Sequence, residues 1–313
     1  MSTAQIRMTL GIQPTGWTNN DFPEIGDDLP YQVILDQTRQ TGFAGGSTGH
    51  NYPTHLPSLL NAMNSRQLKI ASTWVGTAFS TGVGIDAAFQ DFLTQVTFLK
   101  AVGSQDVVVA ELADAVNLVR AKSVLRDRPI LNDPQWFLLT QLLDRAGKYA
   151  RDQGMQLSYH PHVGTGVQTL EEAVRLLDST NTDYVGLCLD TAHLRFGGAS
   201  QSDVVELTRK YASRIKHVHL KNVRRSVLPL AMNNGYSFYQ AIEHGIFTVP
   251  GDPAGDLDLH PILQILQEAN YDRWLVIEAE QNPANADPST HKRTTPLKYA
   301  KMARAFLRKH LGY

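Results

Sequence analysis

Polar side chains suited to binding a metal recur at the ends of short apolar stretches in the third quarter of this chain. Four such stretches lie within residues 157–280, and they cover residues 157–162, 185–193, 215–219 and 274–280. Their aliphatic and β-branched residues are typical of buried strands in a parallel sheet. Imidazoles and carboxylates at the carboxyl ends of several parallel strands meet at one end of that sheet. The pattern therefore predicts a metal-centred site at the top of a (β/α)8 barrel.

The rest of the chain alternates between strand-like and helix-like stretches. Besides the strands of those four stretches, the first of which begins at residue 155, we expect strands at residues 9–13, 43–47, 68–75 and 107–111. We expect helices at residues 30–40, 56–66, 86–102, 134–153, 170–177, 203–211, 260–269 and 296–310, with Ser202 capping the helix at 203–211. Eight strands and eight helices in alternation predict an α/β fold, a (β/α)8 TIM barrel, with residues 1–313 as a single domain.

Charge and composition restrict the class of protein. The 29 Lys and Arg residues nearly balance the 30 Asp and Glu residues, so we expect no nucleic-acid partner and no binding to anionic membranes. The one cysteine, Cys188, lies in an apolar strand and is expected to be a packed, inert thiol in a reducing compartment. The first residues, Met1 to Gln5, lack a signal-peptide pattern, and no apolar run reaches about 18 residues. These features predict a soluble, cytoplasmic protein.

One polar residue from each of the four strands is a candidate metal ligand. These residues are His160, Asp190, His219 and Glu278. Two imidazoles and two carboxylates suit Mn, Co, Mg or Zn, and the sequence does not choose between these metals. A single histidine at such a position is more often a hydrogen-bonded core residue, and a strand-end aspartate often only caps the next helix. Four such residues on successive strands favour the metal site.

Neighbouring groups are candidates for proton transfer. His162 leaves its strand on the same face as His160, and His193 follows Asp190 at the start of the next loop. Either imidazole could move a proton at neutral pH, although a structural role is equally compatible with the sequence. Glu111 ends the fourth strand and could contact metal or substrate. His217 shares a strand face with His219, and we assign His219 to the metal because it is nearer the carboxyl end.

Five further residues are candidates for substrate binding. Glu280 follows Glu278 by two residues and could bind substrate or hold a loop. Lys221 and Arg224 could neutralise a carboxylate, a phosphate or an enolate, although a solvated charge cluster is an equally good interpretation. Trp17 and Trp74 could stack on a sugar-like ring, but large aromatic residues more often lie in the core.

At these residues the chain resembles the xylose isomerase-like (sugar phosphate isomerase/epimerase) barrels, and within them the dehydratases that act on inososes. The resemblance runs nearly end to end, and its motifs cover residues 11–21, 159–168, 189–193, 217–224, 247–252 and 274–283. The resemblance implies that His160 replaces the glutamate ligand usual at the end of the fifth strand. It also implies that His162 matches the proton-transfer histidine of related dehydratases. One departure is the second strand, where residues 45–49 carry no carboxylate.

The resemblance implies a metal-dependent lyase that removes water from a ketoinositol or a related cyclic polyol ketone through an enolate. The alternative is a sugar or sugar-phosphate isomerase or epimerase, because the same metal, enolate and base also serve those reactions. A nuclease would need a basic groove, which the charge balance disfavours, and a non-catalytic barrel would be expected to lack the ligands. The expected partner is a small-molecule polyol or sugar, and a homo-oligomer is possible.

Overall fold

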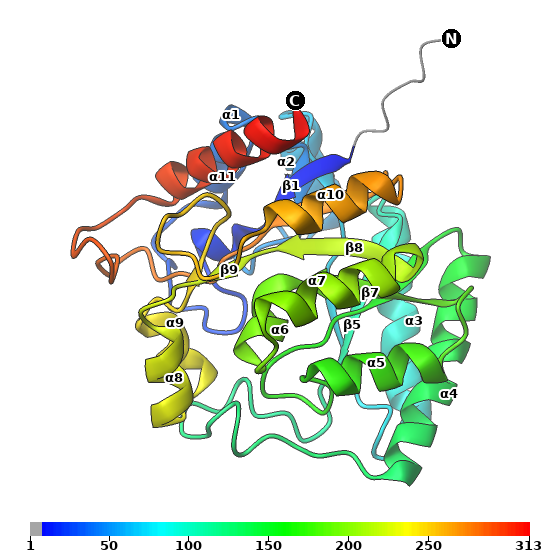
Figure 1. Ribbon diagram of the computed structural model, residues 1–313. Helices are drawn as coiled ribbons and strands as arrows, with labels where there is room; N and C mark the ends of the chain where they lie inside the picture. Colours follow the sequence, from blue (N-terminus) through cyan, green and yellow to red (C-terminus); the bar gives the residue numbers. More distant parts are fainter. Residues whose placement is uncertain (1–7) are drawn as a thin grey trace.

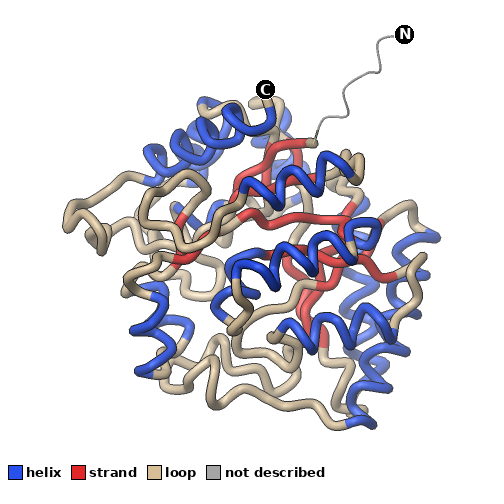
Figure 2. Tube along the Cα trace, in the orientation of Figure 1, coloured by secondary structure: helices blue, strands red, loops and turns tan. Residues whose placement is uncertain are grey.

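Parallel strands form the centre of the molecule, and helices cover their outer side (Figure 1; Figure 2). The computed structural model describes residues 8–313. Seven strands are hydrogen-bonded in parallel in the order β1–β11–β8–β7–β6–β5–β4. Their bounds are Thr9–Ile12 (β1), Trp274–Ile277 (β11), Ile215–Leu220 (β8), Val185–Asp190 (β7), Gln156–Tyr159 (β6), Asp106–Glu111 (β5) and Trp74–Thr77 (β4).

Two short strands close the ring between β1 and β4. Strand β2 (Gly45–Gly46) pairs in parallel with β3 (Lys69–Ile70), and the amide of Ala44 donates to Leu10 O at 2.8 Å. A Cβ atom on Gly45 would lie 1.8 Å from Lys69 O, so neighbouring backbones approach too closely for a side chain. Because β3 and β4 are two parts of one interrupted strand, the described residues form an eight-stranded ring. The predicted (β/α)8 barrel is confirmed.

The eight long helices agree with the predicted ones to within a few residues. Their bounds are Tyr31–Gln40 (α1), Leu56–Asn64 (α2), Ile85–Ala101 (α3), Asp133–Asp152 (α4), Leu170–Ser179 (α5), Gln201–Lys210 (α7), His260–Glu268 (α10) and Pro296–Leu311 (α11). The predicted cap of α7 was wrong. Ser200, and not Ser202, accepts the amide of Asp203 at 3.2 Å, while Asp203 accepts the amide of Ser200 in return. This reciprocal capping box starts α7 two residues earlier than predicted.

Several short elements were not predicted. They are the helices α6 (Thr191–Phe196), α8 (Leu228–Asn234) and α9 (Phe238–Glu243) and the antiparallel strands β9 (Asn222–Val223) and β10 (Phe247–Thr248). The expectation of eight helices was therefore too low even for residues 8–313. Elements this short contain too few turns to show a hydrophobic period in sequence.

Three segments pack together over the carboxyl ends of the strands. Phe22, in the segment after β1, lies 5.0 Å from the ring of Tyr239 on α9 (ring centroids). Arg120, in the segment between β5 and α4, lies 4.0 Å above the same ring and pairs with Glu24. This aromatic and charged contact makes a partial cover for the mouth of the barrel.

No helix in residues 8–313 is both long and apolar enough to cross a bilayer. The residues Met1 to Gln5, on which the signal-peptide prediction rests, lie outside the part of the chain that the structure describes. Cys188 is buried and unpaired, as predicted.

Candidate metal centre

Four side chains converge from the carboxyl ends of four adjacent strands. His160 directly follows β6, Asp190 ends β7, His219 lies near the end of β8 and Glu278 directly follows β11. All four are buried, and one potential ligand atom from each lies within 4.8 Å of the others. These are the four residues that the strand-end pattern singled out.

The spacing of the donor atoms fits a divalent ion. His219 Nδ1 lies 2.7 Å from Glu278 Oε2 and 3.8 Å from Asp190 Oδ2, and His160 Nε2 lies 3.4 Å from the same Asp190 oxygen. Atoms that share one ion at about 2.1 Å would be separated by roughly 3 Å. Asp190 Oδ2, His219 Nδ1 and Glu278 Oε2 are buried, and despite these short distances none of them makes a hydrogen bond of acceptable geometry. Buried polar atoms are seldom left without a partner, so this donor set fits a metal.

Burial sets the protonation of these candidate ligands. Burial, with His217 nearby, lowers the pKa of His219 to about 3, and it also lowers the pKa of His160. Burial raises the pKa of Glu278 to about 8 in the metal-free protein. Burial also acts to raise the pKa of Asp190, but Lys221 and His193 outweigh it and hold that pKa well below its usual range. Neutral imidazoles have the free lone pair that a metal needs.

The candidate ligand Asp190 is oriented by contacts outside the centre. Asp190 Oδ1 accepts the amides of Ala192 and His193 at 2.9 and 2.8 Å and so caps α6, which leaves Oδ2 for the centre. Contacts of this kind fix the direction in which a ligand presents its donor atom.

His162 lies beside the candidate ligands with one ring nitrogen free. Its Nδ1 lies 2.8 Å from the carbonyl oxygen of Val163, and because a carbonyl only accepts, Nδ1 carries the proton. The lone pair of Nε2 is therefore available. Burial, with His160 nearby, lowers the pKa of His162 to about 3, so the ring is neutral at physiological pH. Trp74 packs against both His160 and His162 with ring centroids 5.0 Å apart.

His193 differs from its predicted position. It lies in helix α6, not at the start of a loop, and its ring centroid is 3.8 Å from that of His162. Lys221 Nζ lies 3.0 Å from His193 Nε2, and because an ammonium only donates, it occupies the lone pair of that nitrogen. His193 is therefore not free to accept a proton from substrate in this arrangement.

A cavity of about 320 Å³ opens above the centre. Its lining includes His160, His162, His193, His219, Glu278, Glu280, Trp74, Gln13, Asn19, Asn20, Asp21, Ser47, Thr48 and Gln95. Asp21, which sequence reasoning missed, is half-buried, and its carboxylate has no hydrogen bond or ion pair within the described chain. Burial, together with Glu280 and Glu278, raises its pKa to about 7. The one available signal was its position at the end of the motif at residues 11–21.

Four of the predicted substrate or catalytic residues do not line the cavity. Trp17 is buried, and its indole N–H donates to Gln37 Oε1 at 2.6 Å, so it is a core residue. Glu111 accepts hydrogen bonds from the amides of Phe79 and Ser80 and from the hydroxyls of Thr77 and Ser80. These four bonds make Glu111 a structural residue that holds the segment after β4.

The two predicted cationic residues are also buried away from the cavity. Arg224 donates to Gly245 O, Phe247 O, Asp287 and Tyr299, so it anchors the segment after β11. Lys221 is fully buried behind His193 and Glu280. Because both side chains are buried, the interpretation of a solvated charge cluster is wrong for Lys221 and Arg224.

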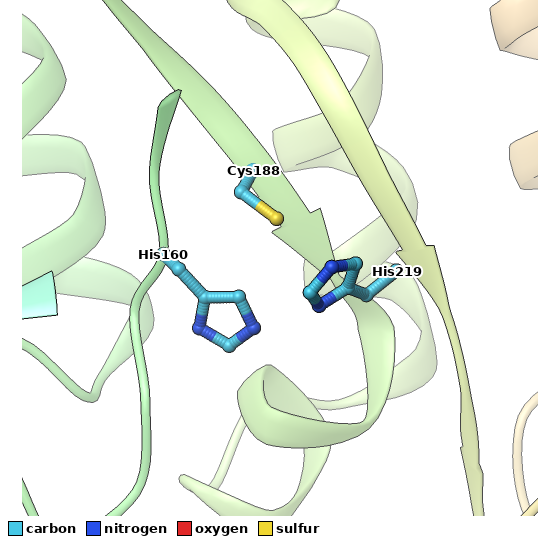
Figure 3. A group of neighbouring side chains, drawn as sticks. All are labelled: His160, Cys188 and His219. Atoms are coloured by element: carbon cyan, nitrogen blue, oxygen red, sulfur yellow. The ribbon is translucent and has the colours of Figure 1, made fainter. Parts of the chain in front are cut away.

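Two further residues of the barrel interior lie next to the centre. Figure 3 shows Cys188 on β7, His219 on β8 and His160 directly after β6 pointing into one space. Burial raises the pKa of the Cys188 thiol well above its usual range, which disfavours the thiolate that metals bind. His217 pairs with Asp106 at 3.2 Å, deeper in the barrel, and is not in the group of four.

Comparisons with known proteins agree with this architecture. The family model described as xylose isomerase-like TIM barrel matches residues 26–310. Inosose dehydratase of Lacticaseibacillus casei (strain BL23) is 39% identical over 284 residues, which cover 91% of this chain and 92% of that protein. Inosose dehydratase of Geobacillus thermodenitrificans (strain NG80-2) is 37% identical and covers 98% of both chains.

Solved structures share the fold at low sequence identity. IolI protein with a bound zinc atom has a TM-score of 0.69 at 15% identity, and the match covers 97% of this chain and 98% of that one. L-ribulose 3-epimerase has a TM-score of 0.67 at 18% identity, and the match covers 98% of this chain and 95% of that one. At such identities the likeness shows the fold alone.

Proposed function

Because this chain belongs to the xylose isomerase-like TIM barrel family, we propose that it is a metal-dependent hydro-lyase that removes water from a ketoinositol or a related cyclic polyol ketone. The observation that carries this proposal is the similarity to inosose dehydratases, at 39% identity over 91% of the chain. The arrangement of the centre supports it, because ligand groups and a free base face one cavity.

In this proposal His160, Asp190, His219 and Glu278 hold the ion. Two imidazoles among the donors favour a first-row transition metal such as Mn, Co or Zn over Mg. A divalent ion held there would polarise a substrate carbonyl and stabilise the negative charge of an enolate. Side chains of the protein carry out the proton transfers and bind the substrate.

We assign removal of the α-hydrogen to His162. Its Nε2 lone pair is free, whereas that of His193 is occupied by Lys221. A positioned base of this kind contributes about 10²–10⁴-fold to a rate. Asp21 and Glu280 line the cavity and are placed to accept hydrogen bonds from substrate hydroxyls. Trp74, which shields His160 and His162, would pack against the substrate ring.

The lining of the cavity favours an unphosphorylated substrate. No Lys or Arg is among its lining residues within the described chain, and its polar side chains are mostly uncharged amides and hydroxyls. A phosphate group is normally bound by Arg, Lys or a helix N-terminus. This observation disfavours the alternative of a sugar-phosphate isomerase and leaves isomerisation of a free sugar as the second candidate.

The test is the mass balance of the reaction. Metal-supplemented protein is incubated with 2-keto-myo-inositol and with a panel of ketohexoses, and the products are analysed by mass spectrometry. Loss of one water from the ketoinositol is expected. Conversion without any change of mass would establish an isomerase or epimerase and would overturn the proposed elimination.

Three expectations from the sequence stay predictions. They are a cytoplasmic location, the absence of a nucleic-acid partner and the homo-oligomer that the sequence left open. Native mass spectrometry of the purified protein would test the last of these.

A further inference from the structure

A second group of potential metal ligands lies beside the first. His162, His193 and Glu280 each offer one ligand atom, and these atoms lie within 4.8 Å of one another. All three residues are buried and line the same cavity. Two imidazoles and a carboxylate are a sufficient set for a second divalent ion. Ligand type alone would therefore suggest a binuclear centre.

Lys221 lies between the two groups. Its Nζ is 3.0 Å from His193 Nε2 and forms an ion pair with Glu280, so it engages two of the three ligands of the second group. The same atom is 3.8 Å from Asp190 Oδ2 and 4.0 Å from Glu278 Oε1, which belong to the first group. The side chain is fully buried. We infer that the Lys221 ammonium takes the place of a second metal ion and keeps the centre mononuclear.

Charge balance supports this inference. The carboxylates of Asp190, Glu278 and Glu280 bring three negative charges into a buried site. One divalent ion and one ammonium bring three positive charges, which balance the charges of these three carboxylates. A second divalent ion beside Lys221 would leave two uncompensated positive charges, and isolated buried charge is very costly. Without Lys221, one divalent ion would leave an excess negative charge that attracts another cation.

The inference also explains why His162 stays free. It is the one member of the second group that Lys221 does not contact, and its Nε2 lone pair is unoccupied. In a binuclear centre this nitrogen would be a metal ligand and could not accept a proton. This consequence rests on the proposed function, in which His162 is the base. The mononuclear state itself does not depend on the reaction.

Metal stoichiometry tests the inference. Wild type, Lys221→Ala, Glu280→Gln and the double variant Lys221→Ala/Glu280→Gln are dialysed against excess Mn²⁺, and bound metal is counted by elemental mass spectrometry. We expect one ion per chain in wild type and two in Lys221→Ala. The double variant should return to one, because Glu280 would hold only the second ion. Electron paramagnetic resonance should show a magnetically coupled Mn²⁺ pair in Lys221→Ala alone.

Several results would overturn the inference. Two ions in wild type would show that Lys221 does not exclude the second one, and one ion in folded Lys221→Ala would show that it does not replace one. If Lys221→Ala fails to fold, Glu280→Gln remains decisive. Its count must equal that of wild type, since in wild type Glu280 binds Lys221 and not metal, and a lower count contradicts the inference. None of these readouts uses substrate, so a failed dehydration assay would count against the proposed function alone.

Discussion

Asp190 divides its two carboxylate oxygens between two tasks. Oδ1 accepts two amides and caps α6, while Oδ2 is buried without a hydrogen-bond partner and faces the other proposed ligands. Glu278 likewise presents a buried Oε2 without a hydrogen-bond partner. At the scale of single residues, an oxygen that makes no hydrogen bond and faces the other candidate ligands distinguishes Asp190 and Glu278 from a structural carboxylate.

This distinction leads to a first prediction. Glu278→Gln and Asp190→Asn should each weaken Mn²⁺ binding strongly. Loss of a residue that only supports a ligand typically costs about 10–100-fold in metal affinity, and these variants should lose more than that. The fold should persist, because the site lies at the end of the barrel that serves function more than stability. Metal titration with circular dichroism of each variant measures both effects.

Glu111 provides the matched control for these variants. It is also a buried strand-end carboxylate, but its oxygens are engaged by backbone amides and hydroxyls. Glu111→Gln should keep the metal and lower the free energy of unfolding by roughly 1.5–3 kcal/mol, since hydrogen bonds to a charged group are lost. Normal metal affinity in Glu278→Gln, or loss of metal in Glu111→Gln, would contradict this assignment.

A second prediction concerns proton transfer. His162→Gln should keep the metal and lose roughly 10²–10⁴ in turnover, because it removes the one imidazole of the pair with a free lone pair. Exchange of the substrate α-hydrogen with solvent deuterium should stop as well. Continued exchange without release of water would instead make His162 the acid for the leaving hydroxyl. Unchanged turnover would remove it from the mechanism.

At the scale of elements, short segments after the strands build the site. Helix α6 begins directly after the candidate ligand Asp190 and carries His193, and α9 supplies Phe238, whose ring lies 5.1 Å from that of His162. The segment after β1 carries Asp21. The long helices fix the strands, and these short segments shape the cavity above them.

The corrected start of α7 gives a third prediction. Ser200→Ala should lower the free energy of unfolding by about 1 kcal/mol, because it removes the side-chain acceptor for the amide of Asp203. Ser202→Ala should cost less, since among residues 8–313 the Ser202 hydroxyl hydrogen-bonds only to that of Ser200. Urea denaturation of the two variants compares them directly. An equal or larger effect at Ser202 would contradict the observed cap.

At the scale of the whole molecule, the barrel interior buries ionisable groups that the unfolded chain would expose. Burial lowers the pKa of His162 and His219 to about 3, and it lowers those of His160 and His193 as well. Burial raises the pKa of Glu278 to about 8 and that of Asp21 to about 7. The buried histidines therefore make the free energy of unfolding rise with pH, whereas Glu278 and Asp21 make it fall with pH.

The fourth prediction is a stability maximum near pH 6.5–7 in the metal-free protein. Below about pH 6.5 these histidines bind protons in the unfolded chain but stay neutral when buried in the folded protein. The free energy of unfolding therefore falls by about 1.4 kcal/mol for each pH unit of acidification and for each such histidine. From about pH 8 down to 6.5, folded Glu278 binds a proton that an unfolded glutamate does not, so stability rises as pH falls. Urea midpoints in a chelator, measured from pH 5 to 8, test this shape.

Adding metal should change that profile. Because the ion needs an ionised Glu278 and neutral imidazoles, the stabilisation that Mn²⁺ gives should grow as pH rises. A metal-free profile that rises steadily from pH 5 to 8 would contradict the linkage through Glu278.

The sequence by itself determined the barrel and the four residues that meet in its centre. Strand and helix periods are local properties, and a polar residue that ends an apolar strand must lie at the carboxyl end of a parallel barrel. Only the tertiary structure decided the depth and the surroundings of each side chain. His217 and His219 share a strand face, yet one pairs with Asp106 and the other joins the centre. Lys221 lies behind the cavity and Asp21 lines it. Chain curvature and packing between distant segments decide both positions, so no local sequence pattern could predict them.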